Sequence, residues 1–200
     1  MMRTLCLTDA DLRLFCALPG LGDLDAATLR RHAPDASLFD EEQGIAVGRA
    51  SLWWRAAPAL RGERAGLIGH YAAADADAAS RLLDAACLQL ASVGCTIAIG
   101  PMDGSTWRRY RLLTERGSEP TFFLELDNPD DWPGHFERSG FEPMAQYYSA
   151  LCDDLAAIPS ADASADPGDD GVVFGLLTAA YTGSISVTAH GLSPALAGYL

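Results

Sequence analysis

The chain of 200 residues contains no lysine: all 14 basic residues are arginines, against 27 aspartates and glutamates. The formal net charge is therefore -13. A field of this sign repels phosphate groups at long range. We therefore expect neither nucleic acid nor an anionic membrane as a partner.

Metal, disulfide and membrane patterns are also missing. The five cysteines form no C-x-x-C pair and have no accompanying histidine pattern, so we expect reduced cysteines and no metal. There is neither a nucleotide P-loop nor a Ser-His-Asp spacing typical of hydrolases. No apolar segment reaches transmembrane length, and Asp9 and Asp11 come before any secretory apolar region develops. A cytoplasmic location is the expectation.

Length and composition predict one α/β domain. Hydrophobic residues make up 49% of the chain, which is enough for a substantial core, and we expect the domain to span residues 1–152. Residues 160–170 (SADASADPGDD) are small and acidic, which is typical of a linker. Residues 171–200 turn apolar again, and they predict either extra strands at the edge of the sheet or a disordered segment.

Hydrophobic periodicity and turn residues predict a mixed sheet flanked by helices. The expected elements are, in chain order, strand 4–7, a helix after Thr8, helix 24–32, hairpin strands 37–39 and 45–54, strand 65–73, a helix from Asp75 or Asp77 to 93, and strand 96–99, then strand 121–126, helix 129–139 and strand 144–152. Strands 65–73 and 96–99 with the helix between them form a βαβ unit, so they should be parallel.

A long polar and aromatic segment, residues 100–120, follows this unit. Loops of this length in a domain are usually functional or carry a short helix. Trp107, Arg108 and Arg111 belong to a basic and aromatic cluster that suits a phosphate, a carboxylate or an adenine ring. The alternative is a helix that packs Trp107, Tyr110 and Leu113 inward while its arginines pair with surface aspartates.

The element order resembles the GNAT acyl-CoA N-acyltransferase family over residues 49–151. The resemblance is to bacterial GNAT-like proteins with a G-P-M-[DN] turn, here residues 100–103, followed by Asp127-Asn128-Pro129 and Gly140-Phe141. It implies a GNAT-like fold and transfer of an acyl group from acetyl-CoA or another acyl-CoA to a small-molecule amine. A homodimer is compatible with it.

The same resemblance implies where the acyl-CoA binds. Strands 65–73 and 96–99 would part, the pantetheine arm would follow the first strand, and the pyrophosphate would bind the amides that open the next helix. The implied cofactor contacts are Ile68, His70, Ala72, Ala74, Asp77, Ala79 and Asn128. The backbone N–H groups near residues 68–70 would stabilise the oxyanion.

Two departures from the family pattern affect this site. The pyrophosphate loop usually has Arg or Gln, Gly, and Gly or Ala at positions that here are Ala74, Asp77 and Ala79, and only Ala79 fits. Asp75 or Asp77 either caps the helix or repels the pyrophosphate, and Arg81 or an arginine of residues 108–111 would have to compensate. Many relatives have a tyrosine as general acid where this chain has Phe136.

Acyl transfer needs a base for the attacking amine and an acid for the leaving thiolate. Asp103, Glu125 and His70 are the candidate bases, and His135 is the candidate acid, with Tyr147 or Tyr148 as substitutes. The structural alternatives are an Asx turn at Asp103, an exposed strand position at Glu125 and an exposed helix position at His135. The departures leave a second function open, a non-catalytic GNAT-fold module that binds another ligand or a protein.

Overall fold

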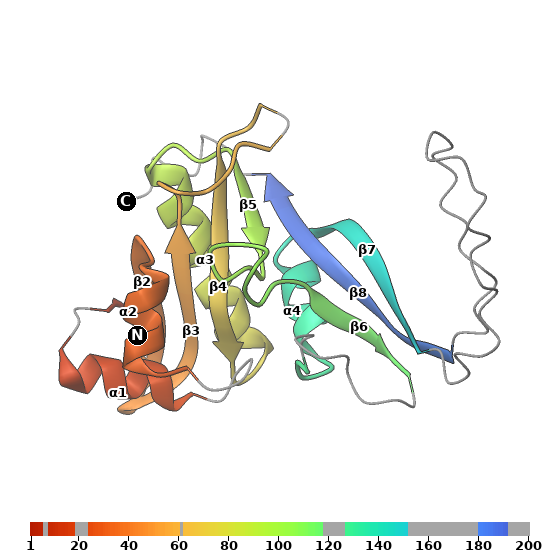
Figure 1. The fold of residues 1–200 in the computed structure, drawn as a ribbon. Coiled ribbons are helices and arrows are strands. Elements are labelled where there is room, and N and C mark those ends of the chain that lie inside the picture. The colour runs from red at the N-terminus through yellow and green to blue at the C-terminus, as the bar shows by residue number, and fades with distance from the viewer. Residues whose placement is uncertain (6–7, 19–23, 61, 118–126, 152–179, 192–200) are drawn as a thin grey trace, which may run out of the picture.

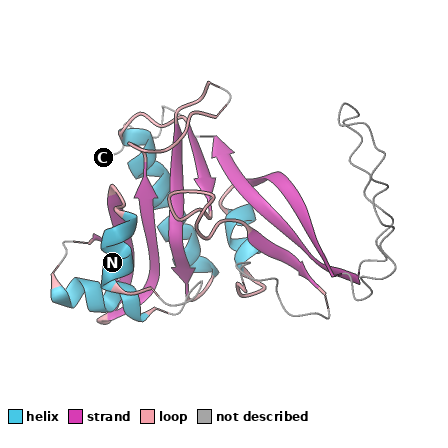
Figure 2. Cartoon of the chain, viewed as in Figure 1, coloured by secondary structure: helices cyan, strands magenta, loops and turns pink. Residues whose placement is uncertain are grey.

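The computed structural model describes all residues of the chain except 6–7, 19–23, 61, 118–126, 152–179 and 192–200. An eight-stranded mixed sheet runs through the molecule, with helices on both of its faces (Figures 1 and 2). This arrangement confirms the predicted α/β class. Within the described part of the chain, no helix is both long enough and apolar enough to span a membrane.

The helices and strands follow the predicted order, except that a strand at 112–116 lies in the segment 100–120, where a functional loop or a short helix was expected. The helices are α1 (Asp9–Ala17), α2 (Ala26–His32), α3 (Ala76–Ser92) and α4 (Trp132–Arg138). The strands are β1 (Met2–Thr4), β2 (Ala36–Glu42), β3 (Ile45–Trp53), β4 (Ala65–Ala73), β5 (Ile97–Gly100), β6 (Leu112–Arg116), β7 (Glu142–Leu151) and β8 (Ala180–Gly191). Their order in the sheet is β1-β2-β3-β4-β5-β8-β6, and β7 pairs with β8.

Polar caps begin three of the helices. The side chain of Thr8 accepts a hydrogen bond from the N–H of Asp11 at 3.1 Å, and Asp25 accepts one from Thr28 at 2.6 Å. Asp75 accepts one from the N–H of Ala78 at 2.8 Å, so Asp75 rather than Asp77 is the cap of α3. Each cap satisfies a backbone donor that the helix itself cannot use.

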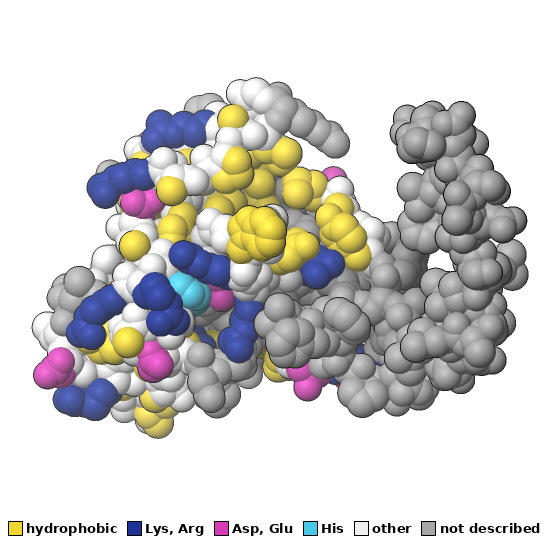
Figure 3. Space-filling view, in the orientation of Figure 1, with side chains coloured by type: hydrophobic (Ala, Val, Ile, Leu, Met, Phe, Trp, Pro, Cys, Tyr) yellow, Lys and Arg dark blue, Asp and Glu magenta, His cyan; other side chains and the backbone are white. Residues whose placement is uncertain are grey.

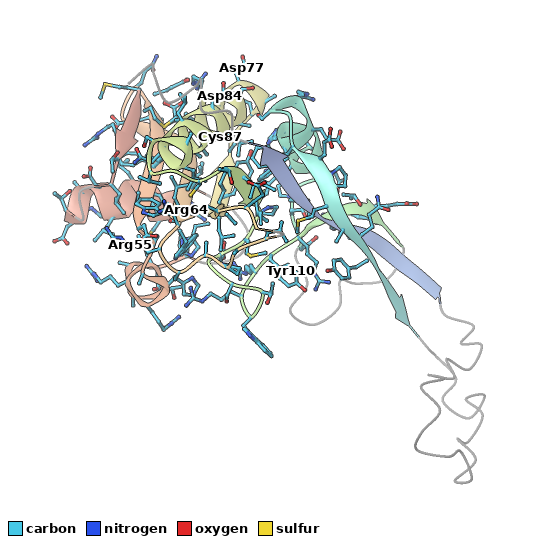
Figure 4. All side chains as sticks on the ribbon, turned by 90° about the horizontal axis from the view of Figure 1, so that it is seen from above. Arg55, Arg64, Asp77, Asp84, Cys87 and Tyr110 are labelled. Atoms are coloured by element: carbon cyan, nitrogen blue, oxygen red, sulfur yellow. The ribbon has the colours of Figure 1, made fainter. Side chains whose placement is uncertain are left out.

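Apolar side chains pack on both faces of the sheet. The larger cluster joins α3 and α4 to the central strands, and its largest fully buried side chains are Leu52, Ile68, Tyr71, Leu82, Leu83, Leu90, Trp132 and Phe136. The opposite face carries α1 and α2 through Leu12, Phe15, Leu29 and Phe39. Figure 4 shows Asp77 and Asp84 on the α3 side and Tyr110 on the other side of the sheet.

The β4-α3-β5 unit confirms the predicted parallel pair. β4 pairs with β5 from Ala65 opposite Ile97 to Leu67 opposite Ile99. Beyond this point no described strand pairs with β4 on this side. The N–H of Met102 donates to the carbonyl of Ile68 at 2.7 Å, and the chain then turns away into the segment that leads to β6. The two strands therefore part, as the resemblance implied.

The position of β8 differs from the expected edge of the sheet. β8 lies inside the sheet, where it pairs antiparallel with β5, β6 and β7. It uses the backbone groups on the side of β5 that faces away from β4, and such groups are stabilised by pairing with another strand. The predicted linker 160–170, residues 171–179 and 192–200 of the predicted C-terminal segment, and the predicted strand 121–126 lie outside the described residues.

Candidate active site

A cavity of about 680 Å³ opens on the α2 face of the sheet. Its lining residues come from the α2 region, from β3 and β4, and from the segment after β5: Leu24, Thr28, His32, Arg49, His70, Tyr71, Asp103, Thr106, Trp107, Arg108, Arg109, Tyr110 and Arg111. In Figure 3, dark-blue arginine side chains surround a cyan histidine surface on one face of the molecule. The volume is typical of a site for a small molecule.

A bulge in β4 shapes the floor of this cavity. Arg49 pairs with Ala72, but Ser51 pairs with Gly69, so β4 has one residue more than β3 between these two pairs. His70 lies in this bulge with a φ of 46°, which residues other than glycine seldom adopt. Such backbone strain is common at functional sites.

The bulge and the alternation of the strand send His70 and Tyr71 to opposite faces. The ring of His70 stacks on His32 with 5.0 Å between ring centroids. The ring of Tyr71 instead contacts Trp132 and Phe136 in the core on the α3 and α4 side. The sequence alone left open which of the two side chains faces the cleft, and the structure shows that it is His70.

A chain of hydrogen bonds leads inward from the cavity. His32 Nδ1 lies 2.8 Å from His70 Nε2, and His70 Nδ1 lies 3.0 Å from Ser51 Oγ. Ser51 Oγ in turn lies 2.8 Å from Ser37 Oγ. Burial and the neighbouring positive charges lower the pKa of His70 to about 3 and also lower the pKa of His32. Both imidazoles are therefore neutral near pH 7, and His70 in particular binds an added proton only weakly.

Asp103 is held against the backbone of the bulge. Its Oδ1 accepts a hydrogen bond from the N–H of His70 at 2.5 Å, and its Oδ2 lies 3.9 Å from His70 Nε2. Burial raises the pKa of Asp103 to about 6, although the bond from His70 and the nearby arginines oppose the shift. The carboxylate thus bonds to β4 rather than closing an Asx turn before a helix, since the described residues 104–111 form turns and bends.

Gly69 explains how the segment after β5 comes so close to β4. A Cβ atom at Gly69 would lie 2.3 Å from the carbonyl oxygen of Met102 and 2.6 Å from the Cα of Asp103. Both are backbone atoms, so no side-chain rotation would relieve the clash. Glycine at this position therefore permits the contact that holds Asp103 in place.

Arginines surround the histidine pair and Asp103. Arg49 is 2% exposed, and its Nε and Nη1 donate to the carbonyls of His70 and Phe15 at 3.2 and 2.9 Å. Burial lowers its pKa to about 10. Arg108 donates to the carbonyls of His32 and Asp103, while the guanidinium of Arg111 lies 4.4 Å from the centroid of the Tyr110 ring.

None of the four cavity arginines forms a salt bridge with a described carboxylate. These are Arg49, Arg108, Arg109 and Arg111. Elsewhere in the described chain, some arginines do, namely Arg3, Arg55, Arg81 and Arg116, while others such as Arg13 and Arg64 do not. Trp107 is 96% exposed at this rim, so the interpretation of residues 107–113 as a helix packing Trp107 inward is wrong. The cavity carries positive charge within an acidic chain.

The start of α3, where the resemblance places the pyrophosphate, already uses several of its polar groups. Asp75 caps Ala78, the N–H of Ala74 donates to the carbonyl of Val47 at 2.8 Å, and the N–H of Ala79 donates to the carbonyl of Asp75. Arg81 is paired with Asp40 and Glu42 at 2.7 and 2.6 Å. The compensating charge expected from Arg81 is therefore engaged elsewhere.

Other predicted site residues lie away from the cavity. His135 is 2% exposed rather than exposed on its helix, and its Nδ1 lies 3.0 Å from the hydroxyl of Tyr71. Asn128 is fully buried, and its amide pairs with the backbone N–H and carbonyl of Leu113. Ile68 and Ala72 are buried in β4, and Glu125 lies outside the described residues.

Sequence reasoning missed His32 and Arg49, whereas Arg109 belongs to the predicted basic cluster. Arg49 gives a signal, because it is the only charged residue of β3. His32 gives none, since a histidine in the last turn of a helix is ordinarily explained by the helix dipole. Its role depends on the contact with His70, 38 positions away in the chain.

His32, His70 and Asp103 also offer three potential metal-ligand atoms within 4.8 Å of one another. Their spacing suits hydrogen bonding better than coordination, because nitrogen ligands on tetrahedral zinc lie about 3.3 Å apart. The two histidine nitrogens are only 2.8 Å apart. Nearby arginines also oppose a dication, so we interpret the cluster as a hydrogen-bonded network.

No protein-family model and no curated protein matches the sequence, but several solved structures share its fold. An aminoglycoside 6'-N-acetyltransferase from Enterococcus faecium aligns at a TM-score of 0.55 and 10% identity over 97% of this chain and 98% of its own. A ribosomal-protein-alanine N-acetyltransferase from Brucella melitensis aligns at 0.54 and 13% identity, over 96% and 99%. An N-acetyltransferase from Staphylococcus aureus Mu50 aligns at 0.53 and 9% identity, over 96% and 98%. The expected GNAT fold is confirmed.

Proposed function

We propose that this chain, which has the GNAT fold, is an N-acyltransferase that transfers an acyl group from acetyl-CoA or another acyl-CoA to a small amine. The observation that supports it most is the cavity beside the β4 bulge. There a buried carboxylate and two neutral histidines lie next to the point where β4 and β5 part. Such groups are what amine deprotonation requires.

The chemical step is aminolysis of a thioester. The amine nitrogen attacks the thioester carbonyl carbon, the C–N bond forms, the C–S bond breaks, and the coenzyme leaves as a thiolate that water protonates. The nitrogen loses one proton to the protein. We assign that proton to Asp103, whose pKa of about 6 leaves it ionised at neutral pH, with His32 as the group that faces the cavity beside it.

The structure supports the proposed acyl-CoA site less well than the proposed amine site. Beyond Leu67 no described strand pairs with β4 on the β5 side, which leaves that edge of its last residues for the pantetheine arm. The N–H of His70, expected to stabilise the oxyanion, donates instead to Asp103. We keep Ala72, Ala74, Asp77 and Ala79 as proposed donor contacts, and no acid other than water is assigned to the thiolate.

The alternative function is a non-catalytic module, and one observation favours it. The Asp75 carboxylate occupies the start of α3, where the pyrophosphate would bind. An uncompensated carboxylate a few Å from a pyrophosphate costs on the order of 1 kcal/mol or more. A chain that no longer binds acyl-CoA would keep the cavity for another ligand.

Two measurements on the purified protein separate these functions. Calorimetric titration with acetyl-CoA tests the donor site, and release of free thiol from acetyl-CoA in the presence of a panel of small amines tests turnover. Binding with amine-dependent thiol release, lost in Asp103→Asn, is the expected result. No binding by the wild type, with binding gained on Asp75→Arg and Asp77→Gly, would instead identify an abandoned cofactor site.

The acceptor has to be argued from the cavity itself. The solved relatives are named for acceptors as different as an aminoglycoside and the alanine of a ribosomal protein. Aminoglycosides are polycations, and the unpaired arginines of this cavity would repel them. The lining of this chain therefore favours another class of amine.

A further inference from the structure

We infer that the amine acceptor also carries an acidic group, a carboxylate or a phosphate, which the cavity arginines bind close to the amine-deprotonating groups. This inference rests on the proposed function for its acyl-transfer step. The anion site itself stands on the arrangement of the arginines.

The first argument is the unbalanced charge of the cavity. Four arginines line it, and within the described chain none of them has a carboxylate at salt-bridge distance. Among the described lining residues only Asp103 is acidic, and its carboxylate is turned toward the backbone of His70. Placing guanidinium groups together without counter-charge is unfavourable, and a bound anion would relieve it.

The second argument is the state of the Arg49 guanidinium. Its Nε and Nη1 are used by backbone carbonyls, and no described acceptor bonds to its Nη2. Nη2 also keeps some solvent-accessible surface. Among the described residues, only Ser139 Oγ is a side-chain polar atom that is both fully buried and without a partner. Since Arg49 lines the cavity, its Nη2 donors are available to a ligand there.

The third argument is the distance between the charge and the base. Arg49 Nε donates to the carbonyl of His70 at 3.2 Å, and the N–H of the same His70 donates to Asp103, the assigned base, at 2.5 Å. A ligand whose acidic group binds Arg49 while its amine contacts the base must have these two groups only a few bonds apart. Amino acids and short amino phosphates have this spacing, and a carboxylate or phosphate matches the fork of arginine donors.

At the mouth of the cavity, Arg109 and Arg111 add charge without being fixed by ion pairs. Arg109 is exposed, and Arg111 is held between the rings of Tyr110 and Tyr147, at 4.4 and 4.9 Å from their centroids. A guanidinium held by aromatic rings keeps its edge donors directed outward for an anion. Arg109 is exposed and Arg111 is half-buried, so both are open to substitution without disturbing the core.

The experiment compares matched ligands that differ only in the acidic group. Phenylalanine is compared with phenylalaninamide, and phosphoethanolamine with ethanolamine, first by calorimetric titration without acyl-CoA and then as acceptors with acetyl-CoA. We expect the acidic member of at least one pair to bind at least tenfold more tightly, and the two pairs separate carboxylate from phosphate. Equal binding by the acidic and neutral members of both pairs overturns the inference.

Variants then locate the site. Arg109→Gln and Arg111→Gln should each weaken binding of the acidic ligand about tenfold, raise its KM in turnover and leave the KM for acetyl-CoA unchanged. Arg64→Gln is the matched control, because Arg64 is not among the lining residues. If these variants weaken acetyl-CoA binding instead, the arginines serve the donor and the inference is wrong.

The direct titrations keep the two proposals distinct. Preference for acidic ligands without any acyl transfer would contradict the proposed function while supporting the anion site. If neutral amines are acylated and the arginine variants have the same turnover as the wild type, the proposed function is supported and the anion site is contradicted.

Discussion

The carboxylate of Asp103 accepts a hydrogen bond at 2.5 Å from the backbone N–H of His70, the residue that forms the bulge of β4. This contact joins the segment after β5 to β4 at the point where the two strands cease to pair. It fixes an acidic group of raised pKa beside two neutral histidines. Whether the group acts as a base is open to a direct test.

The pH dependence of acyl transfer should follow the ionisation of Asp103. Since burial raises its pKa to about 6, kcat/KM should rise with pH up to about 6 and then level off. Asp103→Asn keeps an oxygen that accepts the bond from His70 but takes no proton, so kcat should fall about 100-fold and this limb should disappear. Steady-state kinetics from pH 5 to 8 test it, and an unchanged profile in the variant would assign the base elsewhere.

The same group should make stability depend on pH. An ordinary aspartate has a pKa near 3.9, so between about pH 4 and pH 6 the folded chain keeps a proton that the unfolded chain has released. The unfolding free energy therefore falls as pH rises through this range, by about 3 kcal/mol.

Urea unfolding of the wild type and Asp103→Asn at pH 4, 5, 6 and 8 measures this contribution. Asparagine does not titrate, so the difference in unfolding free energy between the two proteins should change across this range and stay constant above it. A difference that does not vary with pH would mean that the carboxyl has an ordinary pKa.

Substitution of Gly69 tests the close contact between the two backbones. Gly69→Ala would place a Cβ atom 2.3 Å from the carbonyl oxygen of Met102, so the segment after β5 has to move and the protein should lose about 2–4 kcal/mol of stability. Gly48→Ala is the control, because its nearest neighbour would be Leu82 Cδ2 at an ordinary 3.5 Å. Similar denaturation midpoints for the two variants would show that the contact is loose in solution.

Local signals were sufficient to predict most elements. Thr8 caps α1 as the sequence indicates, Asp75 is one of the two caps predicted for α3, and the limits of β4 coincide with the predicted strand 65–73. The βαβ order also predicted the parallel pair. These features depend on residues only a few positions apart or on a rule of connection handedness.

The site depended on contacts that no local pattern records. His32 meets His70 only because α2 packs over the bulge of β4, and Arg49 becomes a cavity residue because α1 supplies the carbonyl of Phe15 to its guanidinium. The interior position of β8 likewise depends on pairing with strands far away in the chain. Tertiary packing, rather than residue type, therefore determines the positions of His32, Arg49 and β8.

The cap of α3 should oppose acyl-CoA binding. Asp75→Ala removes the bond to the N–H of Ala78, so it should cost about 1 kcal/mol of stability while it frees an amide and removes a like charge from the pyrophosphate position. Acetyl-CoA should therefore bind more tightly to the variant than to the wild type, by about tenfold.

Asp25→Ala is the matched control for this effect, because Asp25 caps α2 through Thr28 in the same way. It should cost similar stability and leave acetyl-CoA binding unchanged. If both cap variants bind acetyl-CoA as the wild type does, the start of α3 is not the pyrophosphate site.

Substitutions of Tyr71 and His135 test whether this hydrogen-bonded pair has a structural or a catalytic role. The Tyr71 hydroxyl lies 3.0 Å from His135 Nδ1, and both side chains are buried on the α4 side of the sheet. Burial lowers the pKa of His135, although Asp131 opposes the shift, so the ring is neutral near pH 7 and an unpaired nitrogen is costly. Tyr71→Phe should therefore destabilise the protein by about 1–3 kcal/mol.

Acyl transfer at a temperature where the Tyr71→Phe variant remains folded should keep the kcat of the wild type, because the Tyr71 ring and its hydroxyl contact Trp132 and His135 on the α4 side rather than His70 or Asp103. His135→Gln should behave in the same way and lose stability without losing turnover. A fall in kcat of tenfold or more in both folded variants would assign the protonation of the leaving thiolate to His135, and it would require the donor to bind on the α4 side of β4.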